Sequence, residues 1–139
     1  MSGLQLRVVS QEQELVNSEV SQVTAPSEGG EITILPGHAA LVAQLQVGEL
    51  TYVINNKPST IVVSAGFLSV SRADEVIVIV DSAVDERNIS LQKAEAAVKA
   101  AQQTVVSSKE REELIRAEAS LRRAMLEVKV ALRSKKTKI

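Results

Sequence analysis

The apolar residues of this chain follow two different patterns, one before and one after about residue 83. In the first part, Leu4, Leu6 and Val8 alternate with polar neighbours, as do Ile32 and Ile34. Apolar β-branched runs follow at 50–54, 60–63 and 76–80, and turn residues separate them at 26–30, 36–37, 48, 55–56, 66 and 73–74. Short strands at this spacing predict an antiparallel β-sandwich or flattened barrel over residues 1–83.

The second part has a helical pattern. All six glycines and all three prolines lie at or before Gly66, so the remainder lacks the two strongest helix breakers. An alanine-rich stretch predicts a first helix over about 88–102. Ser107 and Glu110 have capping-box spacing, which predicts that a second helix begins there. The sequence therefore predicts a helical hairpin over 84–139. The apolar stripe expected on its second helix is Leu114, Ala117, Leu121, Ala124 or Met125, Val128 and Leu132.

This hairpin is expected to be weakly held, because alanine buries little area. Three acid-first i,i+4 pairs would add only tenths of a kcal/mol each. They are Glu95–Lys99, Glu112–Arg116 and Glu118–Arg122. A weakly held hairpin could serve as a moving part.

Composition narrows the possible functions. The 139 residues include no cysteine, which excludes disulfides, thiolate zinc sites and cysteine nucleophiles. No apolar run approaches the roughly 18 residues that a membrane span needs, and no signal peptide is visible. We therefore expect a soluble chain that reaches a membrane only through partners.

Charge is divided unequally between the two parts. Through Ala83 there are three bases and nine acids, whereas from Val84 onward there are thirteen bases and eight acids. From Arg122 to the C-terminus, seven bases accompany one acid, Glu127. This basic end would suit an acidic protein surface, nucleic acid or an anionic membrane, or it is simply a solvated helix end. The lack of stacking aromatics and the acidic first part disfavour nucleic acid, and the absence of Trp or Phe on the helix disfavours membrane.

Candidate catalytic chemistry is sparse. His38, the single histidine, lies in Leu35-Pro36-Gly37-His38-Ala39 with no readable nucleophile or orienting carboxylate, so an exposed loop histidine is the simpler interpretation. The acid pairs at 74–75 and 85–86 fit a turn and a helix start. Gly29-Gly30 lacks the spacing of a phosphate-binding loop. We expect no enzyme activity, no metal and no cofactor.

Four segments resemble the epsilon subunit of F-type ATP synthases. They are 27–39, which contains the Pro36-Gly37-His38 turn, then 45–48, 64–70 and 76–83, followed by the helical hairpin. The order and spacing match along essentially the whole chain. The tail Leu121-Arg122-Arg123-Ala124 is most similar to cyanobacterial and chloroplast members.

The resemblance implies a sandwich of about ten strands and a hairpin in a rotor subunit, monomeric when isolated. Such a subunit binds the gamma subunit and the c-ring, couples proton flow to ATP synthesis and restrains ATP hydrolysis. It lies on the cytoplasmic or stromal face of a coupling membrane, here the thylakoid. Glu31 and His38 are expected on a turn that faces the c-ring. Arg122 and Arg123, with Arg116 and Arg133, are expected to meet acidic loops of the beta subunits when the hairpin extends.

One family feature departs from the pattern. Some bacterial members bind ATP at the start of the hairpin, but here the stretch Val84-Asp85-Glu86-Arg87-Asn88 lacks a spacer and has Asn88 in place of alanine. On a helix, this shift of one residue is a rotation of about 100°. We therefore predict no physiologically useful ATP binding. Ala40 replaces a common proline, which should loosen the turn slightly.

Two alternatives stay open from sequence. In the first, the chain only couples gamma to the c-ring and the hairpin never extends; hairpin amide protection as strong as that of the sandwich would favour it. In the second, the chain is a prefoldin-like or nucleic-acid-binding adaptor that uses its basic helix. Binding to RNA or DNA at physiological salt would distinguish this alternative.

Overall fold

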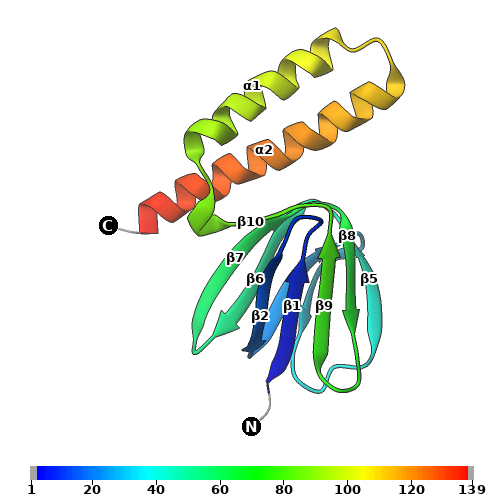
Figure 1. The fold of residues 1–139 in the computed structure, drawn as a ribbon, viewed down its shortest axis with the longest axis vertical. Coiled ribbons are helices and arrows are strands. Elements are labelled where there is room, and N and C mark those ends of the chain that lie inside the picture. Colours follow the sequence, from blue (N-terminus) through cyan, green and yellow to red (C-terminus); the bar gives the residue numbers. More distant parts are fainter. Residues whose placement is uncertain (1–2, 138–139) are drawn as a thin grey trace. The chain divides into compact units, whose positions relative to one another are not determined.

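Ten β-strands occupy the first 85 residues in the computed structural model, which describes residues 3–137, with side chains described through residue 134. Figure 1 shows them as the strand-rich unit. They are β1 (Leu4–Val9), β2 (Glu14–Val20), β3 (Gln22–Ser27), β4 (Gly30–Ile34), β5 (Leu41–Leu45), β6 (Gly48–Ile54), β7 (Lys57–Val63), β8 (Gly66–Val70), β9 (Glu75–Val80) and β10 (Ala83–Asp85). The predicted sandwich of about ten strands is confirmed.

The strands form two halves of five. The hydrogen-bonded order is β10-β7-β6-β3-β5-β8-β9-β1-β2, with β4 pairing only with β3. β3 and β5 meet through a single residue pair, Ser27 and Leu45, so the ladder nearly breaks there and the halves can face each other. The strand pairings of the predicted antiparallel sandwich include a parallel pair, formed by β1 and β9.

The core of this unit lies between the two halves. Alternate residues of β1 and β9 point inward, and Leu4, Leu6, Val76 and Val78 are fully buried. Tyr52 is the aromatic residue of this core and is 5% exposed. Aliphatic side chains from all but the shortest strand fill the remainder, as expected of a chain with two aromatic residues.

Three turn predictions were wrong because strand pairing extends through them. Gly48 begins β6 and pairs with Val63. Pro26 belongs to β3 and pairs with Glu31, and its carbonyl accepts a hydrogen bond from the Gln46 N–H at 2.9 Å. Gly66 begins β8 and pairs with Val80. A Cβ at Gly66 would collide with the backbone of β9, so the close approach of these strands requires glycine there.

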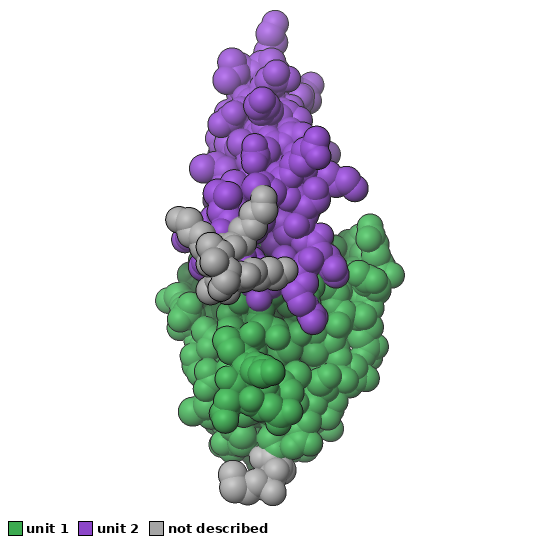
Figure 2. All heavy atoms as spheres, turned by 90° about the vertical axis from the view of Figure 1, so that its left-hand side faces the viewer, with its two compact units in different colours: residues 1–85 green, residues 86–139 purple. Residues whose placement is uncertain are grey.

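The second unit, residues 86–139, contains a short 3-10 helix and two α-helices; Figure 2 colours the two units separately. The boundary falls two residues after the predicted one, because β10 still pairs with β7 of the first unit. The elements are η1 (Glu86–Asn88), α1 (Leu91–Ser107) and α2 (Arg111–Thr137).

Capping sets the helix bounds differently from prediction. Ser90 is the N-cap of α1, and its hydroxyl accepts from the Lys93 N–H at 3.3 Å. Ser107 caps no second helix: it ends α1 and donates its hydroxyl to the Gln103 carbonyl at 2.8 Å. The hydroxyl is therefore used within α1, and α2 begins only at Arg111.

Small residues line the packed faces of the two helices. Ala94 and Ala101 are buried on α1, and Ala117, Ala124, Val130 and Ala131 are buried on α2. Of the predicted alternatives, Ala124 is buried and Met125 is 53% exposed. Leu132 is 46% exposed, so the predicted stripe was wrong at that position, where Ala131 is buried instead. Alanines at these positions allow the helices to approach closely.

Candidate functional site

The Pro-Gly-His segment forms a β-turn immediately after β4. The His38 N–H donates to the Leu35 carbonyl at 3.1 Å, with Pro36 and Gly37 as the central residues. Gly37 has φ +86°, which suits a type II turn and favours glycine. The Gly37 N–H donates to Asp74 Oδ1 at 2.8 Å, and His38 Nδ1 lies 2.7 Å from the Ala39 carbonyl oxygen. His38 is therefore half-buried in an ordered turn.

Glu31 and His38 do not lie on one turn. Glu31 is the second residue of β4, next to the β3–β4 hairpin turn, whereas His38 follows the other end of β4. Glu31, Thr33 and Leu35 are exposed at alternate positions, and Leu35 is 52% exposed. An exposed strip about 13 Å long therefore runs along β4 from Glu31 to Leu35. It connects Glu31 with the turn that carries His38. β4 pairs on one side only, so this strip lies at an edge of the sandwich.

The four predicted arginines are exposed on α2 and form two pairs. At 100° per residue, Arg122 and Arg133 lie within about 20° of one another, as do Arg116 and Arg123. The two pairs are about 100° apart around the helix. Arg123 and Arg133 make further polar interactions in the structure. Lys135, Lys136 and Lys138 of the basic end lie outside the residues whose side chains are described.

The three acid–base pairs expected on the helices do not form ion pairs. In the part of the chain with described side chains, Glu95–Lys99, Glu112–Arg116 and Glu118–Arg122 make no ion pair within 4.0 Å, whereas Arg7 and Glu14 do so at 3.5 Å. Exposed pairs of this kind gain too little to hold two long side chains in one geometry.

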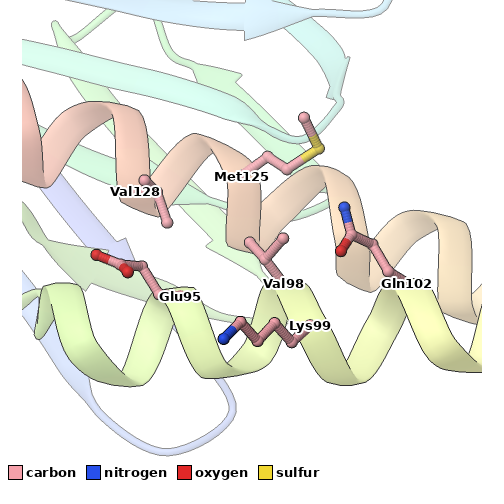
Figure 3. Close-up of a pocket in the computed structure, with 6 residues that line it drawn as sticks. All are labelled: Glu95, Val98, Lys99, Gln102, Met125 and Val128. Carbon is pink, nitrogen blue, oxygen red and sulfur yellow. The ribbon is translucent and has the colours of Figure 1, made fainter.

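A shallow groove of about 360 Å³ runs between α1 and α2 (Figure 3). Its walls bring Val98 of α1 toward Val128 of α2, with Glu95, Lys99 and Gln102 along the α1 side and Met125 on α2. The groove holds no convergent set of acids, histidine or nucleophiles. Among the described residues, no group of three or more His, Cys, Asp or Glu side chains is placed to hold a metal ion.

Glu127, on α2, is a carboxylate whose titration the fold alters. Burial raises its pKa above the ordinary carboxyl value, and the positive charge of Arg123 opposes this with a smaller effect. The half-buried carboxylate is therefore less readily ionised than an exposed one.

An apolar surface on the sandwich was missed by sequence reasoning. Val42 of β5, Phe67 of β8 and Ile79 of β9 are 71%, 57% and 59% exposed, and we call these three residues the β5–β8–β9 patch. The three strands are neighbours, and Phe67 pairs directly with Ile79. Val42 lies across from Ser69, two residues along β8 from Phe67. A groove of about 420 Å³ that includes Phe67 and Ile79 adjoins it. The sequence contains an indication of this patch: residues 76–80 are apolar at every position, so both faces of that strand are apolar.

The stretch that departs from the family's ATP-binding pattern is not α-helical. Val84 and Asp85 end β10, and Glu86–Asn88 form η1. The predicted rotation of about 100° therefore does not apply to these residues, and the prediction of no useful ATP binding rests on the missing spacer and on Asn88. Neither α1 nor α2, over its described residues, is long and apolar enough to cross a membrane.

Comparison with known proteins identifies relatives over the whole chain. Residues 3–86 match the family described as ATP synthase, Delta/Epsilon chain, beta-sandwich domain. An ATP synthase epsilon chain from Dehalococcoides mccartyi is 41% identical over 137 residues, covering 98% of this chain and 97% of the relative. One from Herpetosiphon aurantiacus is 38% identical over 128 residues, covering 92% and 93%.

Solved structures share the architecture. A chain in the Euglena gracilis mitochondrial ATP synthase, OSCP/F1/c-ring assembly superposes with a TM-score of 0.74 at 25% identity, covering 97% of this chain and 82% of that chain. A chain in the Tetrahymena thermophila central stalk/c-ring structure, at 15% identity with a TM-score of 0.60, shares the fold; the coverage is 94% and 99%. Dehalococcoides and Herpetosiphon are bacteria outside the cyanobacteria. The comparisons therefore support the resemblance to the epsilon subunit, and not the finer similarity to cyanobacterial and chloroplast members. The chain belongs to the ATP synthase epsilon chain family.

Proposed function

We propose that this chain is a non-catalytic rotor subunit that couples proton flow to ATP synthesis and inhibits ATP hydrolysis through its C-terminal helices. Membership in the ATP synthase epsilon chain family supports the assignment of this chain to an ATP synthase complex. The exposed features of the chain also suit protein contacts: an apolar patch on the sandwich and cationic stripes on α2. The observation that carries the proposal is the β5–β8–β9 patch, because three large apolar side chains on neighbouring strands need a partner to leave water.

The partner at this patch is the gamma subunit. Phe67 supplies the aromatic anchor that protein interfaces commonly use, and Val42 and Ile79 extend its apolar surface. Phe67 does not belong to the buried core of the sandwich, so a partner can cover its side chain without disturbing that core.

Binding of the isolated chain to gamma tests this assignment. Phe67→Glu should weaken the affinity by about 100-fold, since a charge would replace the anchor. Val106→Glu is the matched control, because Val106 is 87% exposed on α1 and lies outside the patch. Equal affinities for both variants would show that gamma docks elsewhere.

The c-ring contact involves Glu31 and His38, as the resemblance implies. The exposed strip of β4 supports this proposal, because it offers a carboxylate at one end, Leu35 at the other and the ordered turn beyond it. A loop of the c-ring would then lie along an edge strand. The contact surface would be elongated instead of confined to one turn.

The inhibitory contact with acidic loops of the beta subunits involves Arg116, Arg122, Arg123 and Arg133. Their two-stripe arrangement supports contact on two sides of α2, as expected of a helix that enters a cleft between subunits. All four are exposed, and arginine guanidinium groups characteristically form bidentate pairs with carboxylates.

The experiment is ATP hydrolysis by an epsilon-depleted catalytic head, titrated with the full chain and with a version ending at Asp85. This end point preserves β10 and its pairing with β7. The full chain should inhibit, and the shortened chain should bind without inhibiting. Arg122→Gln together with Arg123→Gln should reduce inhibition, with Lys109→Gln, exposed before α2, as the control. Equal inhibition by full and shortened chains would assign the effect to the sandwich.

The chain would lie on the side of a coupling membrane that faces the catalytic head, held there through the complex. A thylakoid location rests on the similarity of Leu121-Arg122-Arg123-Ala124 to cyanobacterial and chloroplast members. Fractionation of the source cells tests it, and recovery with the plasma membrane would overturn it.

A further inference from the structure

The hydrogen bond that closes the His38 turn does not use the N–H of Gly37. His38 and Leu35 close the turn, and Gly37 occupies the third position with φ +86°. The Gly37 N–H is left without a partner inside the turn, and a backbone donor seeks an acceptor elsewhere. The conformation of this loop therefore depends on which group accepts that hydrogen bond.

The acceptor is a carboxylate from a distant part of the chain. Asp74 Oδ1 accepts from the Gly37 N–H at 2.8 Å, across 37 residues of sequence. A hydrogen bond to an ionised acceptor is stronger than one between neutral groups. Among the described residues, this is also the hydrogen bond that ties residues 36–40 to another segment, since the others formed by these residues are local.

Asp74 is itself held rigidly in the β8–β9 turn. Its carbonyl accepts from the Gln5 N–H of β1 at 2.9 Å, and its N–H donates to the Ser71 carbonyl at 3.3 Å. The Ser71 hydroxyl accepts from the N–H groups of Ala73 and Glu75 at 3.2 and 3.3 Å. Asp74 has φ +59°, a conformation that aspartate tolerates better than most residues. The carboxylate is thus presented from a framework of three strands.

We infer that Asp74 is a positioning residue for the rotor contact: it fixes the Pro36-Gly37-His38 turn against the β1–β8–β9 framework. This inference rests on the proposed contact of His38 with the c-ring. The turn lies between β4 in one half of the sandwich and β5 in the other. Asp74 therefore holds a crossing segment whose other hydrogen bonds are local. Torque passing through His38 would reach the sandwich through this hydrogen bond as well as along the chain.

The variants separate the carboxylate from the backbone conformation. Asp74→Gly suits φ +59° and removes only the side chain, whereas Asp74→Asn tolerates the same φ and keeps an acceptor oxygen. Asn56→Gly is the matched control, because Asn56 also has positive φ, +64°, but lies in the β6–β7 turn. Thermal unfolding of each full-length chain checks that the sandwich is intact.

The first readout is amide exchange of the Gly37 N–H in the full chain. Asp74→Gly should accelerate it by about tenfold or more, because a charge-assisted hydrogen bond is lost. Asn56→Gly should leave it unchanged, and Asp74→Asn should restore most of the protection. Unchanged exchange in Asp74→Gly would overturn the inference at once.

The second readout is ATP-driven proton transport per ATP hydrolysed in the assembled synthase. Asp74→Gly and His38→Ala should both lower this ratio, and Asp74→Asn should keep it near that of the parent. If His38→Ala lowers it and Asp74→Gly does not, the positioning role is overturned and the His38 contact stands. If neither changes it, the His38 contact fails and the positioning role fails with it.

Discussion

The sandwich and the hairpin bury their side chains in different ways. The core of the sandwich consists of 18 buried residues, almost all Leu, Val or Ile. Among the hairpin side chains that the structure describes, the buried ones are five alanines and Val130. Fully burying a Leu or Val side chain contributes about 1.5–3 kcal/mol, whereas each methylene-sized group contributes about 0.8 kcal/mol. The hairpin therefore gains far less per buried residue.

This difference would let one chain contain both a scaffold and the regulatory element proposed above. A partner can shift a conformational equilibrium only by its differential affinity for the two states, so a mobile element must start from a small free-energy gap. The buried alanines of α1 and α2, which we call the alanine seam, allow close packing of the helices and would keep that gap small. The sandwich, with its larger core, can hold its surface contacts in fixed positions.

The largest expected effect is a difference in amide protection. Amides of β9 should exchange only through global opening of the sandwich, and amides of α1 should exchange through local opening that costs about 5 kcal/mol less. Hydrogen exchange of the full chain measures both in one sample. Equal protection would remove the contrast and favour a hairpin that never opens.

The next effect is confined to the sandwich. Leu68→Ala should lower the free energy of unfolding by about 3 kcal/mol, because Leu68 is fully buried and a cavity would remain. Val42→Ala, at a 71% exposed position, should change it by less than about 0.5 kcal/mol. Denaturation followed by Tyr52, the single tyrosine, reports on this core. A similar cost for both variants would contradict the assignment of the core.

A smaller effect is confined to the hairpin. Ala124 is 2% exposed in the seam, so Ala124→Leu should overpack it and cost about 1–3 kcal/mol. Ala96→Leu makes the same change at an exposed position of α1 and should be tolerated. Faster exchange of the α1 amides with an unchanged Tyr52 transition is the expected signature. Loss of the sandwich transition would show that the units unfold together.

The smallest effect depends on pH. Because burial raises the pKa of Glu127, the folded hairpin favours the protonated form, and its stability falls as pH rises from the ordinary carboxyl range through the raised pKa. Glu127→Gln is neutral throughout, so its hairpin should be more stable than the parent at pH 7 and equal to it near about pH 3.

Exposed Glu118 provides the control for this comparison. Glu118→Gln should show no such pH-dependent gain when helix content is measured against denaturant at both pH values. A gain at pH 7 for Glu118→Gln as large as that for Glu127→Gln would mean that burial is not its cause.

The sequence by itself determined the fold class and the elements with the clearest patterns. Period-two alternation identified the strand around Leu6, continuous β-branched residues identified the strand at 76–80, and the absence of glycine and proline after Gly66 identified the helices. These features follow from local propensity and from the hydrophobic period, which neighbours along the chain specify. The motif around Pro36-Gly37-His38 was likewise sufficient to recognise the family.

Only the tertiary structure decided which residues meet. Pairing of β8 with β9 gathers Phe67 and Ile79 into the patch, and a turn 37 residues away supplies the Asp74 carboxylate to Gly37. The parallel pairing of β1 with β9 also depends on partners distant in sequence. Such contacts depend on how strands pair across long separations, and no local period encodes that choice.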